Sequence, residues 1–208
     1  MPFYQDFSDD QSTVLCWKYG EEDRFDEDRL IHPNEKEKVK NYHPKKLLEH
    51  LMVRELLYRQ FPSCYIKYKP SGEPYLFPEV GNISISHAFP FVSIAISQKK
   101  IGIDLEKISD KMLKVKHKFL CDSEILWTNG KENEAELLTI IWAIKESLYK
   151  MHSSKYWSLK KHYEVSEFSI NNLNQIKCSV FDESFCDTFI AKVIKIEDYY
   201  FAKVLVEA

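Results

Sequence analysis

The sequence predicts an α+β fold made of two similar halves. Two long segments, residues 44–61 and 134–151, carry the periodicity of amphipathic helices. Short segments with alternating apolar residues, typical of β-strands, follow each of them. We therefore expect two halves, residues 1–98 and 99–208, each with a long helix packed on an antiparallel sheet. The whole chain is then a pseudodimer of two similar α/β halves.

The first expected helix begins at Pro44, a residue suited to a first helical turn. The second follows Asn133, whose side chain favours the N-cap position. Both have broad apolar faces, formed by Leu47, Leu48, Leu51, Val53 and Leu57 in the first and by Leu137, Ile140, Ile141, Ile144 and Leu148 in the second. The helices also share a seven-residue pattern, VRELLYR at 53–59 and IKESLYK at 144–150, which suggests a duplication.

The expected strands fall into two groups. Between the helices we expect strands at 65–69, 82–88, 91–97 and 101–108, with PSGEP forming a turn after the first of these. After Val165 we expect antiparallel strands at 168–170, 176–181, 186–196 and 199–208.

Composition narrows the function classes. The chain has 208 residues and is 44% hydrophobic and 29% charged, a composition typical of a globular protein. Its net charge of -3 gives no electrostatic reason to expect nucleic acid or an anionic membrane as a partner. None of its five cysteines forms a C-x-x-C pair, so we expect free thiols. The first residues do not resemble a signal peptide, and no apolar stretch approaches the roughly 20 residues of a membrane helix, so we expect a cytoplasmic protein.

Two carboxylates are close together on one expected strand. Asp104 and Glu106 are two residues apart, which places both side chains on the same face. Like charges side by side repel, and a hard divalent cation between them removes the repulsion. Magnesium keeps positions for water and phosphate, so it suits a site that handles a diphosphate. The alternative is a solvated strand edge with Lys107 nearby.

The second helix carries a related set. Trp142, Glu146 and Lys150 are four residues apart in turn, so they share one helical face. Such a carboxylate can be a metal ligand or a base, and such a lysine can contact phosphate. The alternative is a surface ion pair between Glu146 and Lys150, with Trp142 at the edge of the core.

Five segments in order resemble one known family. GIDLEK at 102–107 and WAIKESLYK at 142–150 resemble the paired signature, G-x-D-x-E and W-x-x-K-E-[SA]-x-x-K, of the Sfp-type 4'-phosphopantetheinyl transferases. Upstream, NISISH at 82–87 resembles the family's F-N-I-S-H-S strand, residues 44–57 its basic first helix, and GEPYL at 72–76 its G-K-P-x-[LI] turn. The resemblance covers roughly residues 36–170.

The resemblance implies both a fold and an activity. The family fold is an α+β pseudodimer with its active site in a cleft between the halves, which a monomer can build alone. The implied activity is magnesium-dependent transfer of the 4'-phosphopantetheine arm of coenzyme A, the co-substrate, to a serine of an apo acyl carrier protein or peptidyl carrier domain. Adenosine 3',5'-bisphosphate is released, and Mn²⁺ is an alternative metal.

The family's roles carry over to matching positions of this sequence. Asp104, Glu106 and Glu146 would be the metal ligands, and Glu146 and Lys150 the catalytic residues. Lys150 would contact phosphate and assist the leaving group. Either Glu146 or a metal-held water would take the serine proton.

Five further residues match the family's coenzyme A positions. Lys45, Lys46, Ser86 and His87 would bind the nucleotide end of the co-substrate, although a histidine after a strand is often a structural, hydrogen-bonded residue. Arg54 occupies the family's arginine position. It would either bind ligand or lock its helix through a salt bridge.

The sequence departs from the family pattern in two places. Glu73 stands where the family often has lysine, and a carboxylate there would repel phosphate. The segment after residue 151 lacks the family's glycines, with Ser158 and Leu159 as the remnant of a G-x-G-L segment. A basic cluster in this segment is a candidate docking surface for an acidic carrier, or else a solvated loop: Lys155, Lys160, Lys161 and His162.

Two other function classes compete with the transferase. One is a non-catalytic homologue that binds coenzyme A or a carrier protein, which Glu73 and the missing glycines favour and the intact carboxylates oppose. The other is an unrelated α+β interaction domain, which would show no magnesium-dependent ligand binding.

Overall fold

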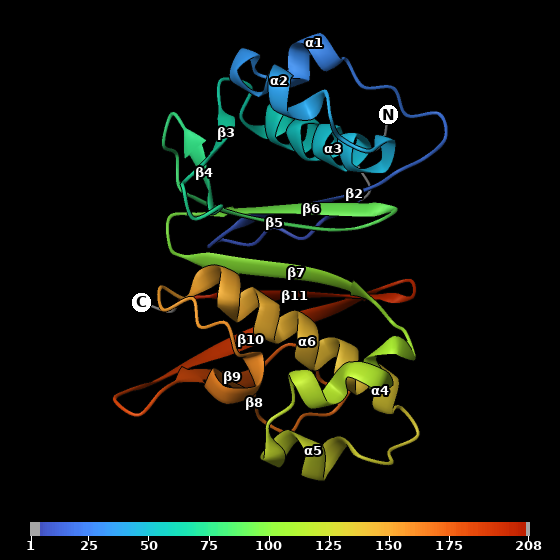
Figure 1. The fold of residues 1–208 in the computed structure, drawn as a ribbon, viewed down its shortest axis with the longest axis vertical. Helices are drawn as coiled ribbons and strands as arrows, with labels where there is room; N and C mark the ends of the chain where they lie inside the picture. The colour runs from blue at the N-terminus through green and yellow to red at the C-terminus, as the bar shows by residue number, and fades with distance from the viewer. Residues whose placement is uncertain (1–4, 207–208) are drawn as a thin grey trace. The chain divides into compact units, whose positions relative to one another are not determined.

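The computed structural model describes residues 5–206 and divides into two compact units, residues 1–98 and 99–208 (Figure 1). Each unit contains a long helix and an antiparallel sheet of its own. The predicted mixture of helices and antiparallel sheets is therefore confirmed.

The first unit contains a four-stranded sheet in the order β1-β2-β6-β5, in which all neighbours are antiparallel. Its strands are β1 (Gln5–Asp6), β2 (Thr13–Lys18), β5 (Asn82–Ala88) and β6 (Phe91–Ser97). Helix α3 (Pro44–Gln60) packs against β6 and β2. The smaller elements are α1 (Glu27–Leu30), the 3₁₀ helix η1 (Pro33–Glu35), α2 (Lys36–Val39) and the hairpin of β3 (Tyr65–Tyr68) and β4 (Pro74–Phe77).

Helix α3 begins where the sequence predicts. Pro44 occupies the first turn, and the His43 side chain accepts a hydrogen bond from the backbone N–H of Lys45. Its buried side chains, which include Met52 and Leu56, meet the apolar residues of the sheet. The central strand β6 is buried along its whole length because it has a strand on each side and α3 over one face.

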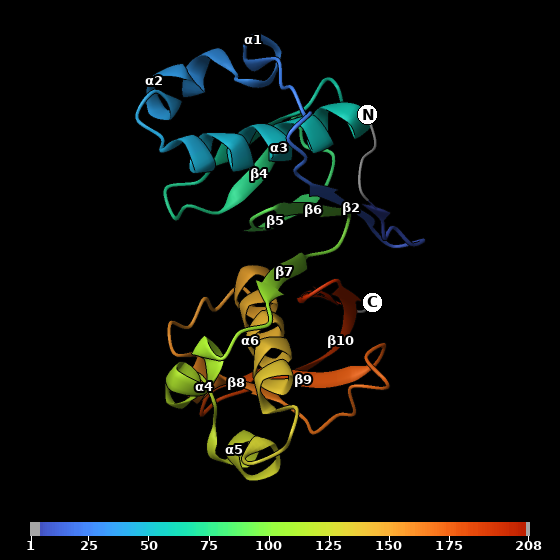
Figure 2. The same ribbon diagram turned by 90° about the vertical axis from the view of Figure 1, so that its right-hand side faces the viewer.

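The second unit contains a five-stranded antiparallel sheet in the order β7-β11-β10-β9-β8. Figure 2 shows this sheet curving around helix α6 (Glu134–Met151). Its strands are β7 (Ile101–Lys107), β8 (Tyr163–Val165), β9 (Ile176–Phe181), β10 (Cys186–Ile196) and β11 (Tyr199–Leu205). The other helices are α4 (Lys111–Val115), η2 (Lys116–Lys118), α5 (Asp122–Thr128) and α7 (Leu159–His162).

The structure corrects three local predictions. Asn133 is at the N-cap of α6, but its side chain makes no capping hydrogen bond. Residues 168–170 form no strand, because Phe168 packs edge-on against Trp127 instead of joining a sheet. Strand β11 ends at Leu205, and residues 207–208 of the predicted strand lie outside the described residues.

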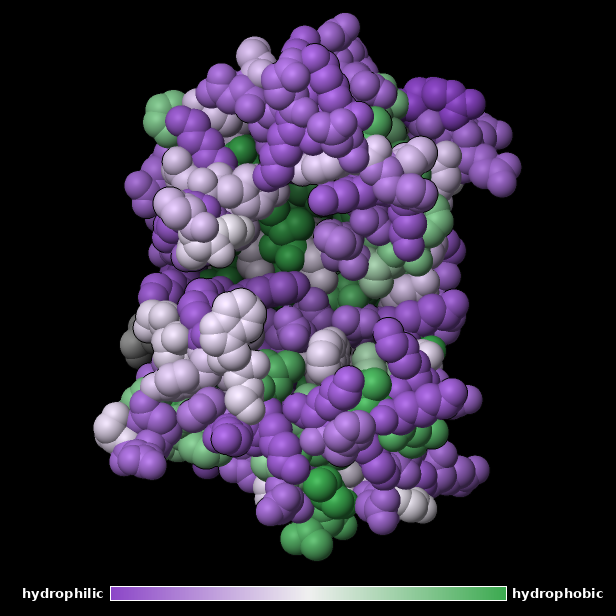
Figure 3. Space-filling model, in the orientation of Figure 1, coloured by the Kyte–Doolittle hydropathy of each residue, from purple (hydrophilic) through white to green (hydrophobic). Residues whose placement is uncertain are grey.

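The described surface is mostly hydrophilic in the view of Figure 3. Apolar side chains reach the surface over α5, where Leu126 is 86% exposed. Across residues 5–206, the helices are too short or too polar to cross a bilayer.

Candidate active site

Strand β7 and helix α6 carry the four central candidates. Asp104 and Glu106 lie on β7, Glu146 and Lys150 lie on α6, and the helix packs directly on the strand. Gly102 explains why the two elements approach so closely. A Cβ atom at this position would lie 1.9 Å from the Ser147 carbonyl oxygen, so any larger residue would push the helix away.

Lys150 and Asp104 form an ion pair across this contact. The Lys150 Nζ atom donates to Asp104 Oδ1 at 2.7 Å and to the Ile103 carbonyl oxygen at 3.0 Å. Strand β7 is buried from Ile101 to Leu105, and Asp104 is only 5% exposed. The solvated-edge alternative is therefore wrong for Asp104. The alternative of a surface ion pair between Glu146 and Lys150 also fails, because Lys150 forms a partly buried ion pair with Asp104 instead.

Glu106 lies beside Trp142, which the sequence placed on the same helical face as Glu146. The indole Nε1–H of Trp142 donates to Glu106 Oε1 at 3.0 Å. Burial raises the pKa of Glu106 to about 7, and the Asp104 carboxylate adds to this effect, while the Trp142 hydrogen bond opposes it. Burial also raises the pKa of Glu146, again with help from Asp104. The three carboxylates therefore repel one another in a partly desolvated place.

The chemistry of this donor set fits magnesium. Three carboxylates offer the hard oxygen ligands that Mg²⁺ prefers, and their mutual repulsion would be relieved by a cation. As the side chains stand, the described part of the chain gathers no three His, Cys, Asp or Glu side chains into a set that could hold a metal ion. Lys150 instead supplies a positive charge at Asp104. Asp104 raises the pKa of the other two carboxylates, but the three side chains do not point at a common position that could hold an ion.

The proposed nucleotide-binding lysines lie in the first turn of α3, in the first unit. Lys45 Nζ is 5.2 Å from the centre of the Phe89 ring, and Lys46 Nζ is 4.2 Å from that of Tyr42. Cation–π contacts at exposed sites such as these are weak. Both lysines are exposed, so their charges are accessible to an anion.

Ser86 and His87 lie on β5, next to each other but on opposite faces of the strand. Ser86 is buried and pairs in register with Ser93 of β6. The His87 side chain is mostly exposed, and its Nδ1 lies 3.4 Å from Glu49 Oε2. Glu49 therefore has to be counted among the charges around any anion bound here.

Arg54 is buried and engaged within the first unit. Its guanidinium donates to both carboxylate oxygens of Glu35, at 2.5 Å from Nη2 and 3.4 Å from Nε. Its side chain is 6% exposed. This geometry supports the helix-locking alternative for Arg54, since the bidentate pair ties α3 to η1.

Glu73, the departure from the family's lysine, pairs with Lys69 at 3.2 Å across the β3–β4 turn. The carboxylate is thus balanced by a nearby amine. The turn presents one charge of each sign where the family pattern has a lysine.

Comparison with known proteins decides the family. A profile of the 4'-phosphopantetheinyl transferase superfamily matches residues 100–204, half of the chain and nearly the whole second unit. This chain is a member of that superfamily. The matched segment contains Asp104, Glu106, Glu146 and Lys150.

Two curated transferases of the superfamily illustrate the similarity. The chain is 30% identical over 110 residues to 4'-phosphopantetheinyl transferase gsp of Aneurinibacillus migulanus, a match that covers 50% of this chain and 46% of the relative. It is 27% identical over 133 residues to 4'-phosphopantetheinyl transferase Sfp of Bacillus subtilis, covering 58% of this chain and 59% of the relative. The chain thus spans about half the length of the curated relatives it matches.

Sequence reasoning missed several groups that contact the candidate residues or lie near them. The spacing placed Trp142 on the face of Glu146 but did not predict its hydrogen bond to Glu106. Nothing in the sequence indicated that Lys145 and Glu124 form a fully buried ion pair. Glu49 was also missed, although it lies four residues after Lys45 and so near the same face of α3.

Proposed function

We propose that this chain transfers the 4'-phosphopantetheine arm of coenzyme A to a serine of an apo acyl carrier protein or peptidyl carrier domain. The observation that carries the proposal is the contact of β7 and α6, which brings three carboxylates close enough for Asp104 to raise the pKa of the other two and pairs Asp104 with Lys150, within the segment that matches the superfamily. The names of the two relatives support the same reaction class.

In this proposal Asp104, Glu106 and Glu146 would hold Mg²⁺, or Mn²⁺ in its place. When bound, the ion would stabilise negative charge on the diphosphate of coenzyme A. Lys150 would give up its pair with Asp104 and turn its Nζ to phosphate. The same ammonium then stabilises the charge that develops on the departing bisphosphate.

The bond changes are those of a phosphoryl transfer. The carrier serine Oγ forms a bond to the β-phosphorus of coenzyme A, and the bond from that phosphorus to the bridging oxygen breaks. Adenosine 3',5'-bisphosphate leaves with the electron pair. Either a Glu146 carboxylate oxygen or a water held by the metal would accept the serine proton.

The first unit, residues 1–98, is proposed to bind the nucleotide end. Lys45 and Lys46 offer two accessible positive charges, and His87 offers an exposed imidazole. Arg54 would act indirectly, by fixing α3 through Glu35. We also propose that the two units are duplicated halves of a pseudodimer and that the chain works as a monomer.

The carrier is proposed to dock on the basic segment around α7. Lys160 and Lys161 lie in this helix, and Trp157, just before it, is 90% exposed. Lys155 and His162 are engaged internally, through carbonyl oxygens of Tyr149, Lys150 and Phe181. The docking cluster therefore reduces to two lysines and a tryptophan, which suit an acidic, partly apolar carrier helix.

The test is to incubate the protein with coenzyme A, Mg²⁺ and an apo carrier, and to measure adenosine 3',5'-bisphosphate by liquid chromatography. We expect release that stops without metal and in Asp104→Ala and Glu146→Ala, while Asp122→Ala, at an exposed position of α5, retains it. Magnesium-dependent coenzyme A binding without release would favour the non-catalytic homologue. Absence of both would contradict the proposed function and favour an interaction domain.

A further inference from the structure

One proposed metal ligand is held by a neutral hydrogen-bond donor. Trp142 Nε1 donates to Glu106 Oε1 at 3.0 Å, and the carboxylate is half-buried. Trp142 lies one helical turn before Glu146 on the same face of α6. The helix therefore supplies one carboxylate to the site directly and orients another through the indole.

The indole is itself held from the other side. The Phe119 ring meets Trp142 edge-on, with ring centres 5.1 Å apart and an angle of 83° between the planes. Phe119 is buried, at the end of the η2 segment. Such edge-to-face packing favours a single orientation of the indole.

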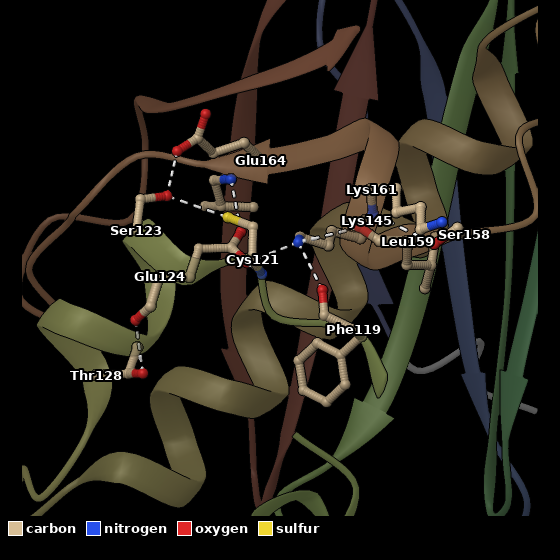
Figure 4. A network of polar contacts seen from close by, with 11 residues as sticks. Phe119, Cys121, Ser123, Glu124, Thr128, Lys145, Ser158, Leu159, Lys161 and Glu164 are labelled. Atoms are coloured by element: carbon tan, nitrogen blue, oxygen red, sulfur yellow. Dashed lines mark hydrogen bonds and ion pairs between the residues drawn. The ribbon is translucent and has the colours of Figure 1, made fainter. Parts of the chain in front are cut away.

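A buried ion pair anchors Phe119 in turn. Lys145 Nζ donates to the Phe119 carbonyl oxygen at 2.8 Å, to Glu124 Oε2 at 2.7 Å and to the Leu159 carbonyl oxygen at 3.2 Å (Figure 4). The side chains of Lys145 and Glu124 have no exposed surface. Removing one partner of an ion pair buried so completely is strongly destabilising, because the other charge is left uncompensated.

Glu124 closes the network on its other side. Its carboxylate also accepts from the backbone N–H groups of Cys121 and Val165, both at 2.8 Å. The ion pair therefore ties together α6, the segment that carries Phe119, and the end of strand β8. A contiguous path runs from this pair through Phe119 and Trp142 to Glu106.

We propose that Trp142 is a positioning residue that fixes the Glu106 carboxylate for a divalent cation, and that the Lys145–Glu124 pair holds Phe119 in place behind it. The inference rests on the proposed function, because it assumes that Glu106 is a metal ligand. Partners that orient a metal-binding carboxylate typically contribute 10- to 100-fold to metal affinity. A tryptophan that only filled the core edge would contribute nothing to it.

The test measures Mn²⁺ binding to the protein alone, without coenzyme A or carrier, from the electron paramagnetic resonance signal of free Mn²⁺. Trp142→Phe keeps an aromatic ring against Phe119 and removes the N–H donor. We expect its Mn²⁺ affinity to fall roughly 10- to 100-fold. Trp127→Phe is the matched control, because Trp127 packs on Phe168 in the same unit, and we expect it to bind as wild type does.

Two further readouts separate positioning from simple loss of stability. Phe119→Leu leaves the indole donor but removes the ring behind it, and we expect a smaller loss of Mn²⁺ affinity than in Trp142→Phe. In the transfer assay, excess Mg²⁺ should restore the maximal rate of Trp142→Phe. Thermal unfolding of every variant is recorded, so that binding is compared among folded proteins only.

The outcomes distinguish the inference from the proposed function. Wild-type protein that binds Mn²⁺ while Trp142→Phe binds it equally well would overturn the positioning role and leave the proposed metal site standing. Wild-type protein that binds no Mn²⁺ would overturn the metal site and the inference together. Loss of affinity in Trp142→Phe, with Trp127→Phe unchanged, would support both.

Discussion

The Lys145–Glu124 ion pair gives the sharpest stability prediction. Lys145→Met keeps an unbranched apolar side chain as far as the Cε position but removes the ammonium group. Glu124 would then stay buried with its two backbone donors and no cation. Breaking a buried pair in this way typically costs about 3–5 kcal/mol, because the remaining charge is left uncompensated. We expect a loss of this size in the free energy of unfolding.

Urea unfolding followed by circular dichroism measures this loss. With a slope of about 2 kcal/mol per molar urea, the midpoint should fall by roughly 2 M. The matched control is Lys195→Met, which removes the exposed pair of Lys195 with Glu136. An exposed pair is worth about 1 kcal/mol or less, so the control should shift the midpoint little.

A double variant isolates the buried charge as the cause. Lys145→Met with Glu124→Gln removes both charges and keeps a side-chain oxygen for one backbone donor. We expect it to be more stable than Lys145→Met alone, because no uncompensated charge remains. If Lys145→Met costs no more than Lys195→Met, or if the double variant is no better than the single, the reasoning about the buried pair is wrong.

Three other predictions follow from single positions. Gly102→Ala should destabilise the protein by about 3 kcal/mol or more in urea unfolding, because its Cβ would overlap the Ser147 carbonyl oxygen, whereas Gly20→Ala, whose Cβ meets nothing closer than 3.9 Å, should change little. Burial, with Arg54 nearby, lowers the pKa of His50 from 6.5 to about 3, so the unfolded chain binds a proton that the folded chain does not. Stability should therefore fall as pH drops from 6.5 towards 3, by at most about 1.4 kcal/mol per pH unit, and urea midpoints of His50→Gln should vary less over this range. Lys150→Met should lower the transfer rate constant at saturating substrates by about 100-fold or more while leaving the protein folded, and a smaller effect would contradict its role at the leaving group.

The long helices and most strands could be predicted from local pattern alone. The predicted segment 134–151 is α6 itself, and 44–61 exceeds α3 by one residue. Strands 82–88 and 91–97 coincide with β5 and β6. These elements succeed because their periodicity is contained within each segment and reflects burial of one face.

Other features depend on partners far away in the sequence. Strand β8 has three residues and owes its pairing to β9, so no local period marks it. The Asp104–Lys150 pair joins residues 46 positions apart, and spacing on the strand or the helix cannot predict which cation meets which carboxylate. In the sequence, Lys145 resembles any other lysine of an amphipathic helix. Its partners, Glu124 and the Phe119 carbonyl oxygen, belong to other segments, so only the folded structure shows the buried pair.

The residue types of the candidate site could be predicted from the sequence, but its geometry could be predicted only in part. The two-residue spacing on β7 and the four-residue spacing on α6 identified groups that the fold does bring together. The indole donor to Glu106 and the pairing of Lys150 with Asp104 required the packing of the helix on the strand. Gly102 permits this packing, because a Cβ atom at its position would overlap the Ser147 carbonyl oxygen.

The most direct test of the central claim is the intact mass of an apo acyl carrier protein after incubation with this chain, coenzyme A and Mg²⁺. We predict that the carrier gains the mass of one phosphopantetheine arm on its serine, and that the gain disappears with a chelator or in Asp104→Ala. A carrier that keeps its mass across several acyl and peptidyl carriers, with folded wild-type protein and metal present, would contradict it.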